Sequence, residues 1–262
     1  MSAESEKIDV YSGATIDRKI KVRIQRGNAE TGIEMVEYDV EYDHTEVVLD
    51  IVHRVQAEFA PDLAVRWNCK AGKCGSCSAE INGMPKLMCM TKMVDYDGDE
   101  VIEIRPMRTF PVIKDLVTDV SWNFEVNKRI KPFKPPEGLN ELTMEQRHVD
   151  RIQEFRKCIE CFLCQNTCHV LRTHDKKQEF AGPRFMIRLA SLQMHPMDTE
   201  ENRLQEIEKD FGVMMCNITR CCTEVCPENI NITDNGIIPL KERVIDGYDP
   251  LAKAISWVKR LL

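Results

Sequence analysis

The residues best suited to chemistry in this sequence are its cysteines, which number twelve. They fall into three groups, at 69–89, 158–168 and 216–226. A disulfide interpretation requires an oxidising compartment. The first residues, MSAESEKIDVYSG, contain neither the apolar core nor the cleavage site of a secretory signal, and they lack the arginine-rich pattern of a transit peptide. We therefore expect an intracellular chain whose cysteines are reduced and bind metal.

The first cysteine group has the spacing of a loop that wraps a two-iron cluster. It follows the pattern C-x4-C-x2-C, with a fourth cysteine after eleven further residues, and consists of Cys69, Cys74, Cys77 and Cys89. This is the spacing of plant-type [2Fe–2S] ferredoxins. Gly72 and Gly75 allow the close backbone approach and the positive φ angles that such a loop requires. A zinc ribbon is the alternative, but zinc ribbons favour paired C-x2-C knuckles, so we predict a [2Fe–2S] site.

The second and third groups form two runs that can be placed in register. The second is C-x2-C-x2-C-x3-C and consists of Cys158, Cys161, Cys164 and Cys168. In two-cluster ferredoxins three cysteines of such a run bind one cubane cluster and the fourth binds the other, so a second run is needed. The third group supplies it with one change. It contains Cys216, Cys222 and Cys226, and Thr219 stands where the second cysteine would be.

This register assigns the ligands of two further clusters. One site takes four thiolates, which suits [4Fe–4S], from Cys158, Cys161, Cys164 and Cys226. The other takes three, from Cys168, Cys216 and Cys222. A cubane corner without a thiolate readily loses its iron, and a threonine hydroxyl stays protonated near neutral pH, so we predict [3Fe–4S] there. Cys221 is out of register, and we interpret it as a buried thiol that is not a ligand; the alternative is that it replaces Cys222.

The elements around the first group are predicted to be mixed α/β. Residues 19–25 and 34–42 alternate polar and apolar side chains, as half-buried strands do. Residues 46–59 carry apolar side chains at helical spacing. Asn82-Gly83, within 78–87, is a strong hairpin signal, and 101–105 predicts a closing strand. This order is compatible with a β-grasp sheet.

The rest of the chain is predicted to be helical, after a proline-rich segment at 130–138 that we interpret as a stiff linker. The expected helices cover 143–157, 183–192, 199–211, 239–245 and 250–262. The last is amphipathic, and we interpret it as docked on the core, with binding to a membrane surface as the alternative. We predict an α+β fold with two domains, residues 1–130 and 131–262.

Composition excludes some functions. The formal net charge of −7 argues against a nucleic-acid partner, because nucleic acids are bound by basic surfaces. No stretch approaches the roughly 18 consecutive apolar residues of a membrane span. We therefore expect a soluble or peripheral protein.

Over nearly its full length the chain resembles the iron–sulfur subunit of the succinate dehydrogenase and fumarate reductase family. The resemblance rests on the CKAGKCGSC loop with Cys89, the CIECFLCQNTC and CNITRCCTEVCP runs, and Phe180-Ala-Gly-Pro183. It implies a β-grasp N-terminal domain and an all-α, helical ferredoxin C-terminal domain. It also implies a flavoprotein partner that holds FAD and oxidises succinate, and membrane anchor subunits near which quinone is reduced.

The resemblance further implies a path for electrons, from the flavin through [2Fe–2S] and [4Fe–4S] to [3Fe–4S] and then to quinone. The chain would contribute positioning and tuning, with no acid, base or nucleophile of its own. It would serve the tricarboxylic acid cycle and the respiratory chain, held peripherally by anchor subunits at the cytoplasmic face of a bacterial plasma membrane. A quinol:fumarate reductase subunit is the alternative function. A stand-alone ferredoxin-type carrier is a third, and co-purification with a flavoprotein would distinguish it.

The resemblance has one local departure. Better-known members have Pro-Ser after the cysteine equivalent to Cys168, then a tryptophan that hydrogen-bonds the quinone, and a histidine after the equivalent of Cys216. This chain has other residues there, namely His169, Val170, Arg172 and Asn217. The geometry of the quinone site is therefore not carried over. His169 is either a replacement donor or a surface histidine.

Overall fold

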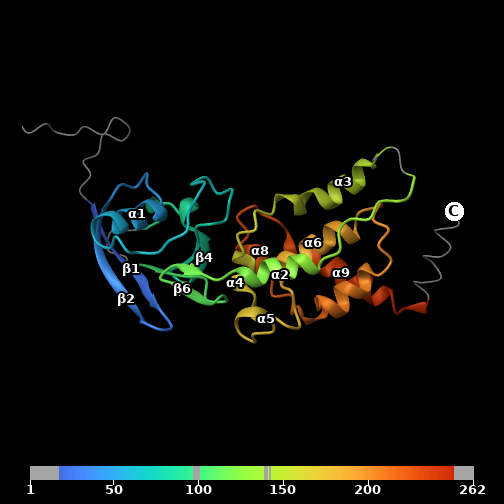
Figure 1. The fold of residues 1–262 in the computed structure, drawn as a ribbon. Helices are drawn as coiled ribbons and strands as arrows, with labels where there is room; N and C mark the ends of the chain where they lie inside the picture. Colours follow the sequence, from blue (N-terminus) through green and yellow to red (C-terminus); the bar gives the residue numbers. More distant parts are fainter. Residues whose placement is uncertain (1–17, 97–100, 139–140, 142, 251–262) are drawn as a thin grey trace, which may run out of the picture.

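The computed structural model describes residues 18–96, 101–138, 141 and 143–250. Strands gather at one end of the molecule together with α1, and the other labelled helices lie toward the opposite end (Figure 1). The chain passes from the first end to the second, because β1 to β7 precede α2 to α9 in sequence. The α+β class predicted from the sequence is confirmed.

Five strands form the main sheet, in the order β2-β1-β5-β3-β4. Their bounds are β1 Arg18–Asn28, β2 Gly32–Tyr42, β3 Ser78–Ile81, β4 Met84–Leu87 and β5 Val101–Arg105. β1 and β5 are parallel, and the other neighbours are antiparallel. The expected strands and hairpin are confirmed. β1 extends beyond 19–25 and β2 begins before 34, because these two strands pair along their whole length.

The alternation of side chains decides which face of the sheet is the core. Ile20, Val22 and Ile24 are buried, whereas Lys19 and Lys21, which alternate with them along β1, are exposed. Helix α1, Val48–Glu58, packs with the sheet through a buried stripe that consists of Val48, Leu49, Ile51, Val52 and Val55. The helix expected at 46–59 is therefore confirmed, with a later start.

Short elements connect the sheet to the helices. Two 3₁₀ turns follow β4, η1 at Met88–Met90 and η2 at Met93–Asp95. A second, two-stranded sheet consists of β6 Val112–Lys114 and β7 Val117–Thr118. Helix α2, Ser121–Arg129, comes next, and its Val126 is buried among the residues of the helical core.

The helical half is built from short elements. The α-helices are α3 Gln146–Ile152, α4 Leu163–Thr167, α5 His169–Arg172, α6 Pro183–Gln193, α7 Arg203–Gln205, α8 Cys221–Glu224 and α9 Ile238–Asp246. The 3₁₀ turns are η3 Gln153–Lys157 and η5 Val213–Met215, and the π-helical turns are η4 Glu206–Asp210 and η6 Ile232–Ile237. Helix α6 is central, since it contacts α4, η3, η6 and α9.

Most of the expected helices are present with altered ends. Those expected at 183–192 and 239–245 are α6 and α9. The one expected at 143–157 begins only at Gln146 and ends as a 3₁₀ turn. The one expected at 199–211 begins at Arg203, because Thr199 donates its N–H and its hydroxyl to the Lys134 carbonyl, at 2.9 Å each. Residues 251–262 of the last expected helix lie outside the described part of the chain.

A buried arginine binds the start of the proline-rich segment at 130–138 to the helical half. Arg203 donates to the carbonyls of Lys131 and Pro132, at 2.8 and 3.0 Å, and from Nε to Asp198 at 2.9 Å. The Arg203 and Asp198 side chains are only 2% and 3% exposed. A buried ion pair is tolerated when its remaining polar groups are hydrogen-bonded. This part of the expected linker is therefore docked on the helices.

Each half has its own hydrophobic core, and the two cores meet at a cysteine loop. Cys161, Phe162 and Leu163 come from the helical half of the sequence but are buried in the core of the sheet half. The shared core fixes the position of the first cysteine group relative to the second.

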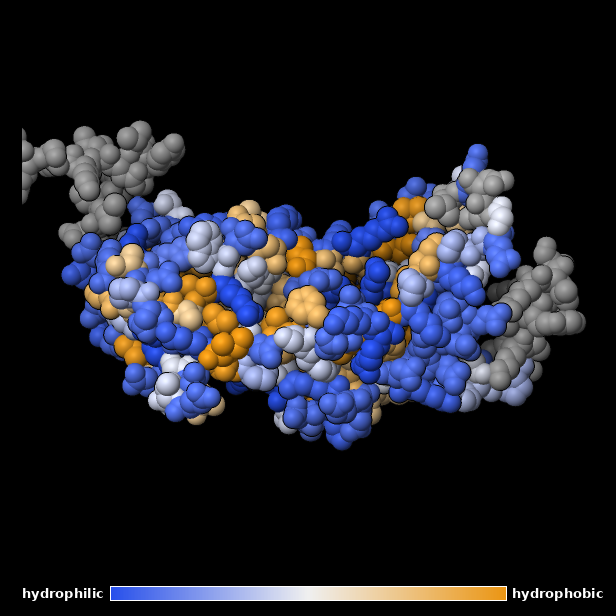
Figure 2. Space-filling view, in the orientation of Figure 1, coloured by the Kyte–Doolittle hydropathy of each residue, from blue (hydrophilic) through white to orange (hydrophobic). Residues whose placement is uncertain are grey.

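Most of the surface in the view of Figure 2 is hydrophilic, with hydrophobic side chains in small patches.

Candidate iron–sulfur centres

The loop between α1 and β3 is shaped around the sulfur of Cys69. The Ala71 and Lys73 N–H groups donate to its Sγ, at 3.4 and 3.3 Å. Gly72 and Gly75 have φ angles of +67° and +70°, in the region where the sequence predicted that glycine is needed. Hydrogen bonds to sulfur are one of the ways in which a protein tunes an iron–sulfur cluster. The loop therefore presents N–H donors to a sulfur that is predicted to bind iron.

The other cysteines of the first group lie beside this loop. Cys77 and Cys89 are buried and hydrogen-bonded to each other. Burial raises the pKa of Cys77 to about 12. Burial also acts to raise the pKa of Cys74, but hydrogen bonds involving Ser76 and Cys69 outweigh it and lower that pKa to about 7. The structure thus brings the four cysteines together from a loop and a 3₁₀ turn.

The second candidate centre is a cavity into which both cysteine runs project. Four cysteines line it, namely Cys158, Cys161, Cys164 and Cys226. Cys226 follows α8 and is held by the Ile230 N–H, which donates to its Sγ at 3.4 Å. The register of the two cysteine runs predicted the same four residues as the ligands of one cluster. The shared cavity is a donor set of four sulfurs, which fits a cubane cluster.

Burial sets the protonation of these thiols in the protein without metal. It raises the pKa of Cys161 to about 12 and that of Cys164 well above the ordinary value. Burial also raises the pKa of Cys158, although the positive charge of Arg184 opposes this rise. A thiolate in such a place requires compensating positive charge. Loading of the site with iron would provide that charge and would release protons.

The third candidate centre gathers Cys168, Cys216 and Cys222. Cys222 lies close enough to the other two for their charges to affect its pKa. Burial raises the pKa of Cys168 to about 11 and that of Cys222 to about 12. Cys222 Sγ is 3.4 Å from Thr233 Oγ1. The charge of Cys221 also acts on the pKa of each of these three thiols, so four cysteine sulfurs lie close together here, and the register of the two runs selects three of them as ligands.

The backbone repeats between the two cysteine runs in the register that the sequence predicted. Glu160 and Phe162, two and four positions after Cys158, have φ angles of 57° and 61°. Ile218 and Arg220 stand at the same positions after the first cysteine of the other run and have φ angles of 58° and 64°. A positive φ is uncommon, especially for a β-branched residue. Its recurrence at both positions therefore indicates a shared backbone path, and a short helix begins at the next residue of each run, α4 at Leu163 and α8 at Cys221.

Cys221 occupies the position that Leu163 occupies in the first run. Leu163 is a core residue, buried between the two halves. Cys221 Sγ lies 3.3 Å from Thr219 Oγ1 and donates to the Thr167 carbonyl at 3.4 Å. Cys221 is partly exposed, not buried as the sequence suggested, because the neighbouring residues 217–220 are exposed. The register favours Cys222 as the ligand, and this choice stays a prediction.

A buried glutamine links the second run to the start of α6. Gln165 donates from Nε2 to Asn123 Oδ1 at 3.2 Å and to the Ala181 carbonyl at 3.0 Å, and its Oε1 accepts the Arg184 N–H at 3.2 Å. A Cβ on Gly182 would stand 2.1 Å from Gln165 Oε1. This close approach explains why the motif at 180–183 has glycine before the proline that opens α6.

The first and second centres touch through the backbone. The Ser78 hydroxyl is shared between the carbonyls of Gly75, at 2.8 Å, and Cys161, at 2.9 Å. A Cβ on Gly75 would stand only 2.5 Å from Cys161 Cα. The two cysteine loops are therefore packed directly against each other, which places their metal sites at a fixed separation.

Sequence reasoning missed a buried polar link between the two halves. Glu80 of β3 is 1% exposed and accepts hydrogen bonds from Arg108 Nε, at 2.8 and 2.9 Å, and from Asn166 Nδ2 at 2.8 Å. Asn166 also accepts from the Thr109 N–H at 3.1 Å. Since Asn166 lies between two cysteines of the second run, this network orients that run on the sheet. The one signal available in the sequence was an acidic residue within a predicted strand.

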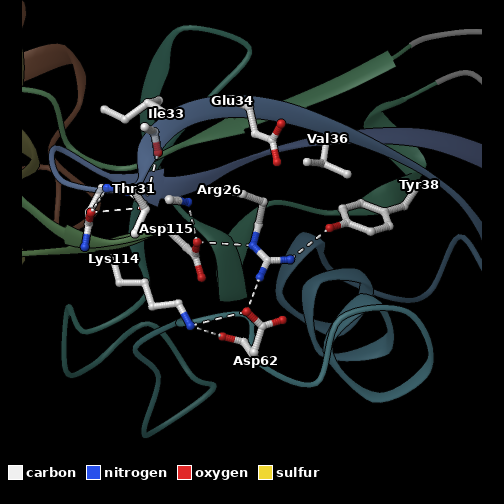
Figure 3. Close-up of a pocket in the computed structure, with 12 residues that line it drawn as sticks. Arg26, Thr31, Ile33, Glu34, Val36, Tyr38, Asp62, Lys114 and Asp115 are labelled. Carbon is white, nitrogen blue, oxygen red and sulfur yellow. Dashed lines mark hydrogen bonds and ion pairs between the residues drawn. The ribbon is translucent and has the colours of Figure 1, made fainter.

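A cavity on the sheet half, apart from the cysteines, is lined by ion pairs (Figure 3). Asp115 is buried, accepts N–H groups from Gly27 at 2.7 Å and Ala64 at 2.8 Å, and pairs with Arg26 at 3.1 Å. Arg26 also donates to Asp62 at 2.7 Å. These contacts anchor the segment that leads from α1 to the first cysteine loop.

The surface beside the third centre includes three exposed apolar side chains, next to exposed Asn217 and Arg220. Met214, Met215 and Ile218 are 42%, 38% and 40% exposed and flank Cys216. His169 opens α5 directly after Cys168 and is partly exposed.

None of the helices in the described ranges is long and apolar enough to cross a membrane. Within those ranges, no three His, Cys, Asp or Glu side chains converge as the ligands of one metal ion would. In a cubane cluster each thiolate binds a different iron, and in a two-iron cluster only two thiolates bind each iron, so the predicted sites do not need that convergence.

Two family models match the two halves of the chain. A 2Fe-2S iron–sulfur cluster binding domain matches residues 19–125, and a 4Fe-4S dicluster domain matches residues 154–230. The predicted two-iron and four-iron domains are thereby confirmed. Together the two models cover most of the sequence.

Related proteins agree with these models. The fumarate reductase iron–sulfur subunit of Escherichia coli O6:H1 is 30% identical over 224 residues, which cover 82% of this chain and 88% of the relative. The corresponding subunit of Wolinella succinogenes is 27% identical over 224 residues, with 81% and 92% covered. A chain of the Mycobacterium smegmatis Sdh1 complex in the apo form is 59% identical, with a TM-score of 0.86, and the match covers 89% of this chain and 98% of that one.

Proposed function

The chain belongs to the iron–sulfur subunits of the succinate dehydrogenase and fumarate reductase family and is an electron-transfer subunit of a multi-subunit oxidoreductase; we propose that it carries electrons from a partner's FAD through three clusters to quinone. The observation that carries this proposal is the cavity where Cys226 meets the three cysteines of the other run. Such sharing of cysteines between runs is how a two-cluster domain is held.

The proposed ligands follow the three groups of cysteines. The [2Fe–2S] site takes Cys69, Cys74, Cys77 and Cys89. The [4Fe–4S] site takes Cys158, Cys161, Cys164 and Cys226. The [3Fe–4S] site takes Cys168, Cys216 and Cys222, with Thr219 at the corner that lacks a thiolate. The repeated positive φ angles at equivalent positions of the two runs support this register.

The fold supports a division of labour between two domains. We assign residues 1–130 to a β-grasp [2Fe–2S] domain, on the basis of the mixed sheet and α1. Residues 131–262 form an all-α ferredoxin domain, which carries the other two clusters. Helix α2 ends near this boundary and packs against the helical core.

This chain's own residues hold and separate the centres. When bound, the clusters supply one-electron carriers whose potentials depend on cluster type, charge and hydrogen bonding. The N–H groups that point at Cys69 Sγ stabilise charge there. The contact of Gly75 with Cys161 and the Glu80–Asn166 hydrogen bond keep the first two centres close together. Six of the proposed ligands are buried, which keeps water from their sulfurs, namely Cys77, Cys89, Cys161, Cys164, Cys168 and Cys222.

One observation favours a working direction for the complex, and another favours particular partners. The 59% identity to a chain of the Sdh1 complex favours succinate:quinone oxidoreductase over quinol:fumarate reductase as the working direction. The apolar surface of Met214, Met215 and Ile218 beside Cys216 fits a membrane anchor subunit and quinone near the [3Fe–4S] site. The chain would then be peripheral at the cytoplasmic face of a bacterial plasma membrane and would serve the tricarboxylic acid cycle and the respiratory chain.

Purification of the complex from native membranes tests this function. We expect an FAD-containing partner, about nine irons per copy of this chain, and succinate:quinone activity. Deletion of the anchor genes is the matched control, and it should release a soluble pair that reduces an artificial dye with succinate but does not reduce quinone. A chain that purifies alone, or that contains several zincs and little iron, would overturn the proposal.

The three-iron assignment has its own test. In Thr219→Cys the new thiol supplies the missing corner ligand, so the oxidised three-iron EPR signal should shrink and a four-iron signal should grow. Thr219→Ser is the matched control, because it changes the side chain without adding a thiolate, and it should keep the three-iron signal. If Thr219→Cys keeps its full three-iron signal at the original potential after reconstitution with excess iron, loop geometry and not the absent cysteine sets the cluster type.

A further inference from the structure

Arg184 places a buried positive charge at the second candidate centre. It follows Pro183 at the start of α6, and it lines the cavity that contains the four cysteines. Its side chain is 8% exposed. Its Nη2 pairs with Glu160, which lies between the first two cysteines of the run. Its Nε is buried and has no hydrogen-bond partner among the residues that the structure describes.

A buried donor without a partner is costly, and more so when it belongs to a charged group. The ion pair with Glu160 does not explain the burial of Arg184, since the Glu160 side chain is 48% exposed and could pair with an arginine at the surface. The backbone fixes the position instead, because Pro183 opens the helix and the Arg184 N–H is bound by buried Gln165. The guanidinium is therefore held at the cavity wall with its buried Nε donor unused.

We propose that Arg184 donates from Nε to the cluster held by the four cysteines, at a cluster sulfide or a cysteine thiolate, and that its charge raises the reduction potential of that cluster. This inference rests on the proposed function. A four-thiolate cluster is negatively charged and gains one more negative charge on reduction, so a nearby buried cation stabilises the reduced form more than the oxidised form. Hydrogen bonds to sulfur act in the same direction.

The position of Arg184 agrees with this sign. Its buried side chain and the four cysteines line the same cavity, so its positive charge lies beside their sulfurs. The neighbouring helix position provides a contrast. Arg188 lies one turn further along α6, is exposed, and is absent from the lining of the cavity. Its charge is screened by water and should have little effect on the cluster.

Redox titration of the complete complex, followed by EPR of the four-iron centre, tests the inference. Arg184→Met should shift the equilibrium of that centre toward the oxidised form by at least tenfold, which corresponds to about 59 mV for one electron. Arg184→Lys keeps a charge but loses the Nε donor and should fall between this variant and the wild type. Arg188→Met, the matched control, should titrate as the wild type does.

The outcomes separate the inference from the function on which it rests. An intact four-iron signal in Arg184→Met with a shift below twofold would overturn the role of Arg184 and leave the proposed function standing. If Arg184→Met fails to assemble the cluster, Arg184→Lys decides the matter: a lowered potential supports the inference, and a wild-type potential overturns it. Absence of the four-iron signal in the wild-type complex would overturn both.

Discussion

Replacement of Gly75 by alanine would test how closely the first two centres are packed. The added Cβ would stand 2.5 Å from Cys161 Cα and 2.8 Å from Cys161 Cβ. Neither atom belongs to the flexible end of a side chain, so one of the two loops would have to move. The φ angle of +70° adds a second penalty, because a residue with a Cβ rarely adopts it.

The size of the effect can be worked out against a matched variant. Gly83 has a φ of +77° and no atom within 4 Å of its would-be Cβ. Gly83→Ala should therefore cost only the backbone penalty of about 1–2 kcal/mol. Gly75→Ala should add an overpacking cost of about 1–3 kcal/mol. At about 2–4 °C per kcal/mol for chains of roughly this size, Gly75→Ala should melt roughly 2–12 °C below Gly83→Ala.

The assay is thermal unfolding of both variants in the assembled complex at one scan rate, followed by circular dichroism. The magnetic interaction between the first two clusters in EPR is a second measurement, and we expect it to weaken in Gly75→Ala only, because the loops are forced apart there. Equal melting temperatures for the two variants, with the same magnetic interaction, would refute the close contact between Gly75 and Cys161.

The other predictions concern separate residues. Cys221→Ser should leave all three cluster signals in place, whereas Cys222→Ser should remove the three-iron EPR signal; the reverse pattern would show that the wrong neighbour was chosen. Arg203→Met would leave the buried Asp198 carboxylate without its partner, at a cost of about 3–5 kcal/mol in urea unfolding, and a loss below about 1 kcal/mol would contradict its burial. Burial lowers the pKa of His195, so the folded state disfavours its charged form. The free energy of unfolding should keep its full value above the unfolded pKa of about 6.5, and it should fall as the pH drops through the lowered folded pKa. His195→Gln should reduce that acid-side loss in a pH series of melting temperatures, and an unchanged series would rule the group out.

The chemistry of the cysteines could be predicted because it depends on short-range spacing. Cys69, Cys74 and Cys77 share one loop, so their separation in sequence limits their separation in space. Cys226 is distant from Cys164, but the internal repeat of the two runs made their meeting predictable, and the cavity contains both. The strands were predictable for a similar reason, since the alternation of β1 follows directly from one buried face.

Other features depended on contacts that no local pattern contains. Thr199 was expected to start a helix, yet its hydrogen bonds to the Lys134 carbonyl hold it outside α7. The segment at 130–138 looked like a free spacer, yet Arg203 docks its first residues. In both cases a distant backbone carbonyl competes with the local preference, and a sequence pattern does not reveal which distant carbonyl is near.

The sequence by itself predicted the kinds of ligand and their grouping into four, four and three, and it determined the order of sheet before helices, because these depend on residue type, spacing and an internal repeat. Tertiary structure alone decided how the groups face one another. Glu80 and Asn166 are 86 positions apart and form one buried hydrogen bond between the halves. Arg184 looks like any arginine near the start of a helix, and only packing buries its unused Nε donor and places the residue in the wall of the cavity that four cysteines line. Burial makes such polar groups depend on a single partner, and the identity of that partner is a property of the folded chain.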